Sequence, residues 1–273
     1  MTAVSTVWEG ARLTWEESGS GDILFLVHGL SESRDAWRHQ VPAFSSHFRV
    51  VSVDVRGFGE SELGAADGSP AQFASDLAHL VEWLAPPGEA SVVGFSMGGV
   101  IAQRLAIDFP GLVRAAVIAS SSSAINKDGQ AWFLDRLEAA TRRPRAEFDE
   151  LNRADAASMA RDFPDDLASE YIDLRRRSVR DVAGYANACR AMASLHKHPL
   201  LGQLGAIDCR TLVLTGELDP SCPPSAAGSI HRRIPGSRLE IVPGVGHLAH
   251  WQDPDAFNRA CLSFLLDNGH DGI

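Results

Sequence analysis

The sequence has few cysteines and no long hydrophobic run. It contains 4 cysteines, and no two of them form a Cys-x-x-Cys pair, which excludes the spacing of a structural zinc site or a dithiol redox motif. We therefore expect free thiols at Cys189, Cys209, Cys222 and Cys261. The most apolar runs, such as Ile23 to Val27 and Ala115 to Ala119, are as short as strands, whereas a helix needs roughly 20 residues to cross a bilayer.

Positive charge is also scarce. The 273 residues carry a formal net charge of -10, and nucleic-acid binding needs a concentrated basic surface, so nucleic acid is excluded as a partner. The first residues, MTAVSTVWEGARLTW, lack a basic leader followed by an apolar stretch, so we expect no secretory signal and a cytoplasmic location. The predicted partner is a small-molecule substrate, without a membrane, and a homodimer is left open.

One histidine pair is a candidate metal site. His196 and His198 could offer two ligands, but no cysteine or carboxylate cluster accompanies them, and an exposed surface pair is the preferred interpretation. We predict no metal and no cofactor.

Short continuous apolar segments alternate with amphipathic ones along much of the chain. Continuous apolar strands are typical of a sheet covered on both faces, which is usually parallel with crossover helices. The pattern predicts a mostly parallel, doubly wound α/β sheet. The expected strands are Ile23 to Val27, Val50 to Val55, Ala90 to Val93, Val113 to Ala119, Thr211 to Thr215 and Arg238 to Val242. An amphipathic segment spans Ser33 to Phe44, and the expected helices are Ser69 to Leu84, Met97 to Phe109, Pro224 to Ile234 and Pro254 to Leu266.

Two regions depart from this alternation. Ser5 to Trp8 and Arg12 to Glu16 are short and alternate in polarity, which predicts an antiparallel hairpin at the edge of the sheet. Between residues 121 and 198 the strands vanish, and helical patterns cover Trp132 to Thr141, Leu167 to Val179 and Val182 to Leu195. We therefore predict a helical insertion at 121–198 between two core segments, 1–120 and 199–273.

A candidate nucleophile lies between an expected strand and an expected helix. Gly94-Phe95-Ser96-Met97-Gly98 has the Gly-x-Ser-x-Gly pattern of a nucleophile elbow, in which a serine occupies a sharp, strained turn. Glycine is needed there because only a residue without Cβ lets the strand and the helix approach each other. The Met97 N-H, at the helix N-terminus, is a candidate oxyanion donor. A plain strand-to-helix turn is the alternative interpretation.

A candidate acid follows a later strand. Asp219 lies in the loop after Thr211 to Leu214, and such loops are where an open α/β sheet gathers functional groups. Its carboxylate can orient a histidine and stabilise the imidazolium. The alternatives are a turn aspartate before Pro220, or Glu217 as the catalytic carboxylate.

A candidate base follows the last expected strand. His247 lies in the glycine-flanked loop Gly244-Val245-Gly246-His247-Leu248, where an imidazole can act as a base near neutral pH. His250, three residues on, is interpreted as structural. The order Ser, Asp, His is that of the α/β-hydrolase architecture.

With these residues assembled, the sequence resembles the α/β-hydrolase family over essentially its whole length. Val27-His28-Gly29-Leu30 resembles the family's oxyanion turn, which implies that the Leu30 N-H is the second oxyanion donor and that His28 shapes the turn. The segment from Asp54 to Ser61 resembles the family's structural Asp-x-Arg-Gly-x-Gly-x-Ser turn. The resemblance implies catalysis by Ser96, Asp219 and His247.

The resemblance further implies that the insertion is a cap over Ser96, which would exclude water and select substrates. The candidate pocket residues are Phe95, Trp132, Phe133, Tyr185 and Leu248, with packing among the helices as the alternative for any one of them. Arg175, Arg176, Arg177 and Arg180 could face an anionic substrate, but a solvated helix face is preferred.

The chain most resembles the capped group that includes carbon-carbon bond hydrolases, enol-lactonases, small-ester hydrolases and cofactor-free haloperoxidases. It departs from the carbon-carbon hydrolases at Phe95, where they usually carry Asn, and at Leu30 to Ser33, where they are rich in Gly. The expected function is serine-dependent hydrolysis of a small ester, lactone or carbon-carbon substrate. Two other functions are left open: a ligand receptor without turnover, and a cofactor-independent lyase or oxygenase on the same scaffold.

Overall fold

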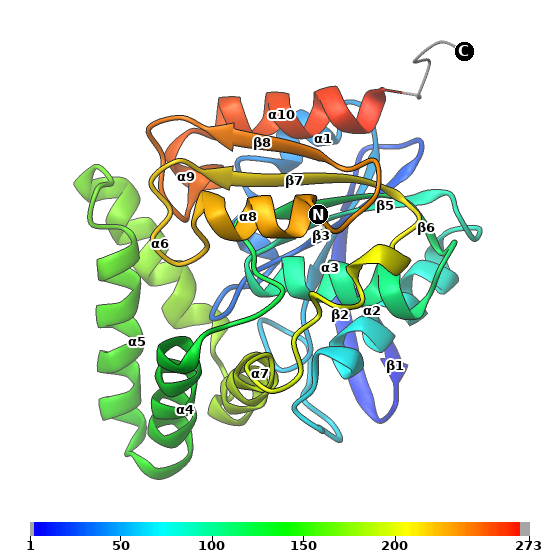
Figure 1. Cartoon of the computed structure of the whole chain (residues 1–273). Coiled ribbons are helices and arrows are strands. Elements are labelled where there is room, and N and C mark those ends of the chain that lie inside the picture. The colour runs from blue at the N-terminus through cyan, green and yellow to red at the C-terminus, as the bar shows by residue number, and fades with distance from the viewer. Residues whose placement is uncertain (1–2, 268–273) are drawn as a thin grey trace.

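The computed structural model describes residues 3–267, so the outermost parts of the two predicted core segments, 1–2 and 268–273, lie outside the described residues. The described chain forms an 8-stranded sheet in the order β1-β2-β4-β3-β5-β6-β7-β8, which confirms the predicted fold class (Figure 1). The strands are β1 (Val4–Trp8), β2 (Ala11–Ser18), β3 (Ile23–Val27), β4 (Arg49–Asp54), β5 (Ala90–Phe95), β6 (Val113–Ala119), β7 (Arg210–Gly216) and β8 (Arg238–Val242).

Pairing within the sheet follows the sequence pattern. The edge strand β1 pairs antiparallel with β2, as expected of the predicted hairpin, and β2 pairs antiparallel with β4. All the other pairs are parallel. Every residue of β3 and of β5 is buried, as a sheet covered on both faces requires.

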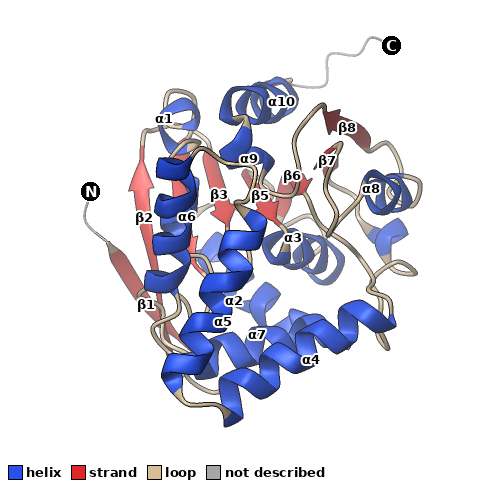
Figure 2. Cartoon of the chain, turned by 90° about the vertical axis from the view of Figure 1, so that its left-hand side faces the viewer, coloured by secondary structure: helices blue, strands red, loops and turns tan. Residues whose placement is uncertain are grey.

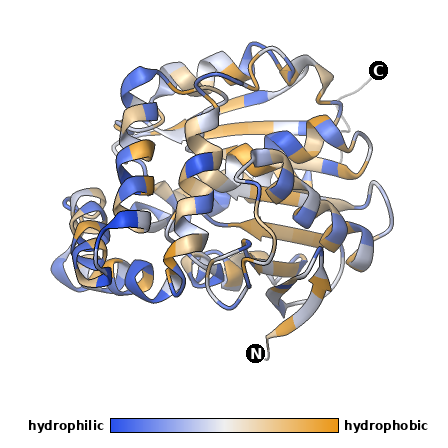
Figure 3. Cartoon of the chain, turned by 90° about the horizontal axis from the view of Figure 1, so that it is seen from below, coloured by the Kyte–Doolittle hydropathy of each residue, from blue (hydrophilic) through white to orange (hydrophobic). Residues whose placement is uncertain are grey.

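Helices cover both faces of this sheet. In Figure 1, α2 (Pro70–Leu84), α3 (Met97–Asp108) and α8 (Pro224–His231) lie on one face, and α1 (Val41–Phe44) and α10 (Pro254–Leu266) lie on the other. Two hydrophobic clusters fill the two layers, and β3 contributes alternately to both: Phe25 packs in the first and Leu24 in the second. The apolar strands and the mixed polarity of the outer helices are visible in Figure 3.

Four further helices connect β6 to β7. They are α4 (Lys127–Arg142), α5 (Arg145–Met159), α6 (Asp165–Ser178) and α7 (Val182–Ser194), and they lie beside the carboxyl ends of the parallel strands (Figures 1 and 2). Three of the four match expected helical patterns. The helix α5 was not predicted, because it is polar and buries only a thin stripe that consists of Phe148, Asn152 and Ala156.

The amphipathic segment Ser33 to Phe44 folds as two short pieces, the 3-10 helix η1 (Arg34–Trp37) and α1. Pro42 has no N-H to donate and cannot extend a helix that begins at Arg34. The remaining short helices are η2 (Leu204–Ala206) and α9 (Ala249–Gln252). None of the helices within residues 3–267 combines the length and the apolar character that spanning a membrane requires.

Candidate active site

Ser96 occupies a strained turn between β5 and α3. Its φ of 53° and ψ of -111° lie in a region that a residue with a side chain rarely adopts. The crowding around the turn explains the two glycines of the motif: a Cβ on Gly98 would lie 2.0 Å from the Val27 carbonyl oxygen, and one on Gly94 would lie 2.2 Å from the Gly98 carbonyl oxygen. The Ser96 N-H donates to the Ala119 carbonyl over 2.9 Å, which ties the turn to β6.

The structure brings Ser96, His247 and Asp219 together. Asp219 follows β7 and His247 follows β8, so both lie at the carboxyl edge of the sheet, where Ser96 follows β5. His247 Nε2 is 3.2 Å from Ser96 Oγ, and His247 Nδ1 is 2.8 Å from Asp219 Oδ2. When the Nδ1–H of the neutral imidazole donates a hydrogen bond to the carboxylate, the lone pair of Nε2 faces the serine hydroxyl.

Asp219 is held in its ionised form by its surroundings. Its second oxygen, Oδ1, accepts hydrogen bonds of 2.8 Å from the Ser221 and Cys222 N-H groups. Burial acts to raise the pKa of Asp219, but the adjacent His247 and these N-H donors outweigh burial and lower it. Glu217, the other carboxylate considered, is exposed and accepts a hydrogen bond of 2.9 Å from the Gly244 N-H instead.

The predicted oxyanion turn lies beside the serine. Leu30 and Met97, whose N-H groups are the two predicted donors, both line the same cavity as Ser96. His28 shapes this turn: its Nε2 accepts from the Val55 N-H over 3.0 Å, and its Nδ1 donates to the Gly29 carbonyl over 2.7 Å. Burial lowers the pKa of His28 to about 4, so the ring is neutral and can make both bonds.

A buried carboxylate connects the predicted oxyanion turn to α6. Glu32 Oε2 accepts from the Gly29 N-H over 2.9 Å, and Glu32 Oε1 accepts from the Tyr171 hydroxyl over 2.8 Å. Glu32 is 1% exposed, and this burial raises the pKa of its carboxyl group. Glu32 could not be recognised from the sequence, because a single glutamate in a turn forms no pattern.

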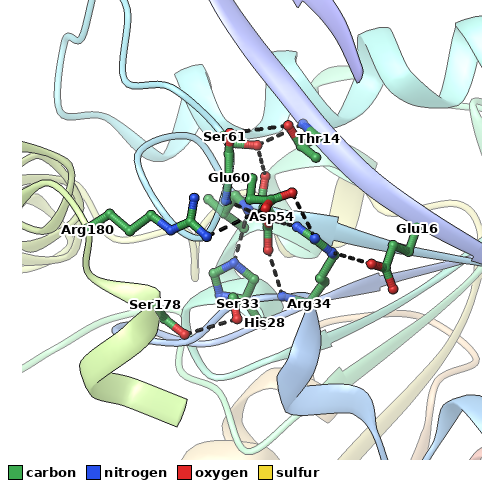
Figure 4. Close-up of polar contacts among 11 residues, drawn as sticks. Thr14, Glu16, His28, Ser33, Arg34, Asp54, Glu60, Ser61, Ser178 and Arg180 are labelled. Carbon is green, nitrogen blue, oxygen red and sulfur yellow. Dashed lines mark hydrogen bonds and ion pairs between the residues drawn. The ribbon is translucent and has the colours of Figure 1, made fainter. Parts of the chain in front are cut away.

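A second polar network, around Asp54, lies next to His28 (Figure 4). Asp54, at the end of β4, accepts from the Arg34 N-H over 2.8 Å and from the Glu60 N-H over 2.9 Å, and its carboxylate forms an ion pair with the Arg34 guanidinium. The Ser61 hydroxyl donates to the Asp54 carbonyl over 2.7 Å. These contacts give the motif from Asp54 to Ser61 the structural role that the resemblance implied.

The C-terminal end of α6 is fastened to this network. The hydroxyl groups of Ser178 and Ser33 are hydrogen-bonded over 3.0 Å (Figure 4). The Gly59 N-H donates to the Ser178 carbonyl over 2.9 Å. Just beyond the helix, Arg180 forms an ion pair of 3.5 Å with Glu60. The helix α6 is therefore attached to the sheet domain both at its end and, through Tyr171, in its middle.

A cavity of about 550 Å³ opens beside Ser96 and His247. Each of α4, α5, α6 and α7 contributes side chains to the lining of this cavity. The segments that carry Ser96, Asp219 and His247 contribute to it as well. The volume is typical of a small-molecule site.

Two of the five predicted pocket residues, Trp132 and Phe133, line this cavity. The other three do not line it and are buried elsewhere. The Phe95 ring packs 4.1 Å from the His250 ring and 5.1 Å from the His247 ring, and the Tyr185 ring packs 5.0 Å from the Phe148 ring. Leu248 is buried at the start of α9. Their positions at strand or helix residues that face the core explain the difference.

Arg175 also departs from the prediction. Arg176, Arg177 and Arg180 are exposed, as expected of a solvated face, but Arg175 is 2% exposed and lines the cavity. The signal was available in the helical period, because Arg175 follows Tyr171 by four residues and shares the buried stripe that Tyr171, Leu174 and Ser178 form on α6.

One group of potential metal ligands exists among the described residues, and it overlaps the site. Asp219, Cys222 and His247 place ligand atoms within 4.8 Å of one another. The aspartate and histidine atoms are hydrogen-bonded to each other. Burial raises the pKa of the Cys222 thiol to about 12, which disfavours the thiolate that a metal needs. This chemistry fits the hydrogen-bonded triad better than a metal site.

The comparisons with known proteins agree with this geometry. A family model described as the alpha/beta hydrolase fold matches residues 22–254. The chain is 29% identical to 3-oxoadipate enol-lactonase 2 of Acinetobacter baylyi, over 92% of each chain, and 28% identical to the pimeloyl-[acyl-carrier protein] methyl ester esterase of Proteus mirabilis, over 92% of this chain and 95% of the esterase. Among solved structures, a thermophilic esterase from Thermogutta terrifontis superimposes with a TM-score of 0.84 and 25% identity, over 97% of this chain and 98% of the esterase. The chain therefore belongs to the family of enzymes with the alpha/beta hydrolase fold.

Proposed function

We propose that this protein is a serine hydrolase that cleaves a small-molecule ester, lactone or carbon-carbon substrate with Ser96 as nucleophile. The observation that carries the proposal is the continuous chain of contacts from Ser96 Oγ through His247 to Asp219, at 3.2 Å and 2.8 Å. A receptor would have no need of all three groups in this order.

In the proposed mechanism, His247 Nε2 takes the Ser96 proton while Oγ attacks the substrate carbonyl. The N-H groups of Met97 and Leu30 stabilise the oxyanion, and the N-terminus of α3 adds a favourable dipole. His247 then protonates the leaving group and activates the water that hydrolyses the acyl-enzyme. For a carbon-carbon substrate the leaving group is a carbanion, and the same imidazole protonates it.

We further propose that residues 121–198 act as a cap over this site, with residues 1–120 and 199–273 as the core. The support is that all four helices α4 to α7 line the cavity that contains Ser96. Enclosure by these helices would limit water at the reacting carbonyl and strengthen the electrostatic contribution of the oxyanion donors.

Labelling with a fluorophosphonate, followed by peptide mass spectrometry, tests the nucleophile. The label should appear on Ser96, and Ser96→Ala should lose both the label and about 10⁴-fold of the hydrolysis rate. Ser122→Ala is the matched control, because Ser122 lines the same cavity but donates its hydroxyl to Cys222 Sγ. Labelling of Ser122, or more than about a tenth of the wild-type rate in Ser96→Ala, would overturn the assignment.

A panel of p-nitrophenyl esters, lactones and a ring-cleavage dienone then separates the substrate classes. Turnover of one class supports hydrolysis and selects among the three. Binding of panel members without any turnover would favour a receptor, and proton transfer that survives in Ser96→Ala would favour a lyase or an oxygenase.

A further inference from the structure

Arg175 is a buried cation that forms no direct ion pair with any described residue, although the charges of Glu32 and Asp155 reach it through space. Its side chain lines the cavity beside Ser96, and none of the ion pairs found within residues 3–267 includes it. Its Nη1 donates to the Met159 sulfur over 2.7 Å, its Nη2 is 3.4 Å from Asn152 Oδ1, and its Nε has no hydrogen-bond partner. A guanidinium is always charged, and burying it without a carboxylate costs several kcal/mol.

The nearby carboxylates are engaged elsewhere. Asp155, which also lines the cavity, accepts hydrogen bonds of 2.6 Å and 3.0 Å from Arg136 on α4. Both oxygens of Glu32 accept hydrogen bonds, from Gly29 and Tyr171. Asp128 lies at the exposed rim of the cavity. Arg175 is the one lysine or arginine among the described residues that line the cavity, and no carboxylate hydrogen-bonds to its guanidinium, so its donors remain available to a ligand.

We infer that Arg175 binds a carboxylate of the substrate, and that the enzyme acts on esters or lactones which carry a second, anionic carboxylate away from the scissile carbonyl. This inference rests on the proposed function of Ser96 and adds the substrate class. The planar fork of a guanidinium matches a carboxylate with two parallel hydrogen bonds, and its ordered position on α6 defines how the substrate lies relative to Ser96.

Two substrates with the same five-carbon acyl chain test the charge preference. Monomethyl glutarate and methyl pentanoate differ at the end remote from the ester, where one has a carboxylate and the other a methyl group. The wild-type enzyme should prefer monomethyl glutarate in kcat/KM, and Arg175→Gln should lower this preference about 10- to 100-fold, the value of a charge-assisted hydrogen bond. Arg175→Lys keeps the positive charge but lacks the two parallel donors of the guanidinium, so its preference for monomethyl glutarate should lie between those of the wild-type enzyme and Arg175→Gln.

Arg176→Gln is the matched control. Arg176 is the next residue of α6, but it is exposed and bonded to Asp173 at 3.1 Å, so its loss should leave the preference unchanged. Thermal unfolding of each variant shows whether the fold is retained, and Arg175→Lys replaces Arg175→Gln where the neutral variant does not fold. Equal preference for the two esters in the wild-type enzyme, or an unchanged preference in both Arg175 variants, would overturn the inference.

A binding measurement separates this inference from the catalytic proposal. Calorimetry of Ser96→Ala with glutarate should show binding that the additional change Arg175→Gln weakens about 10-fold or more. If glutarate binds in this way but the wild-type enzyme hydrolyses no ester, the carboxylate site stands and the hydrolase proposal fails. If esters are hydrolysed through Ser96 but glutarate binding ignores Arg175, the hydrolase proposal stands and the inference fails.

Discussion

Replacing the buried His28 by glutamine should change how the free energy of unfolding depends on pH. The His28 pKa is lowered from 6.5 to about 4 in the folded protein, chiefly by burial. The unfolded chain therefore binds a proton at a higher pH than the folded chain does. The stabilisation is fully present above the unfolded pKa and is lost as the pH falls from 6.5 toward 4.

The magnitude follows from the shift. A lowering of the pKa from 6.5 to about 4 corresponds to about 3 kcal/mol, of which about 2 kcal/mol is lost between about pH 7.5 and about pH 5. Glutamine has an amide oxygen to accept from the Val55 N-H and an NH₂ group to donate to the Gly29 carbonyl, but it does not titrate. His28→Gln should therefore lose about 2 kcal/mol less than the wild-type protein over this interval.

Urea unfolding followed by tryptophan fluorescence measures both proteins at each pH. The comparison uses the difference between two pH values, so a constant loss of packing in the variant cancels. The other buried histidine near the site, His250, whose pKa burial also lowers, is present in both proteins and cancels as well. The same loss of stability in both proteins over this pH interval would show that burial does not lower the pKa of His28, and would refute the argument.

Three further predictions concern the site. Asp219→Asn should lower kcat by orders of magnitude with little change in KM, whereas Glu217→Gln should have a small effect, because Asp219 hydrogen-bonds to His247 and Glu217 bonds to the Gly244 N-H instead. Steady-state kinetics in which Glu217→Gln had the larger effect would reassign the catalytic carboxylate to Glu217. Gly98→Ala should lower the free energy of unfolding by about 1–3 kcal/mol or more, because the added Cβ would clash with the Val27 carbonyl oxygen. An unchanged midpoint of urea unfolding would contradict this. A pH profile of kcat/KM should fall on the acid side, because protonated His247 cannot accept the serine proton, and a flat profile in a folded protein would exclude it as the base.

Much of the fold could be predicted from the sequence because its signals are local. The residues of β3 form a short unbroken apolar run that is typical of a strand covered on both faces, and the structure gives the predicted bounds, Ile23–Val27. Ser69 marked the start of a helix, and its side chain does accept a hydrogen bond from the Gln72 N-H at the beginning of α2. Ser96, Asp219 and His247 could also be predicted from the sequence, because each lies in a short motif that follows an expected strand.

The parts that were not predicted depend on long-range packing. Phe95 and Tyr185 are large and apolar, as pocket residues often are, but only the tertiary structure shows that their rings turn toward other core side chains. The helical period places Arg175 on the buried stripe of α6, four residues after Tyr171, but only the tertiary structure shows that this part of the stripe faces the cavity. Glu32 gains its partner Tyr171 from a segment 139 residues away.

The hydrogen bond from Tyr171 to Glu32 also limits how this enzyme can be recombined with its relatives. Exchanging residues 121–198 for the corresponding helices of another hydrolase would remove Tyr171, leave one oxygen of a buried carboxylate unsatisfied, and disturb the Gly29 amide on the other oxygen. A chimera would then carry a turn, residues 28–33, whose hydrogen bonds are adapted to a helix that it no longer has. Grafting experiments on this scaffold should therefore transfer residues 28–33 together with the helices, as one unit.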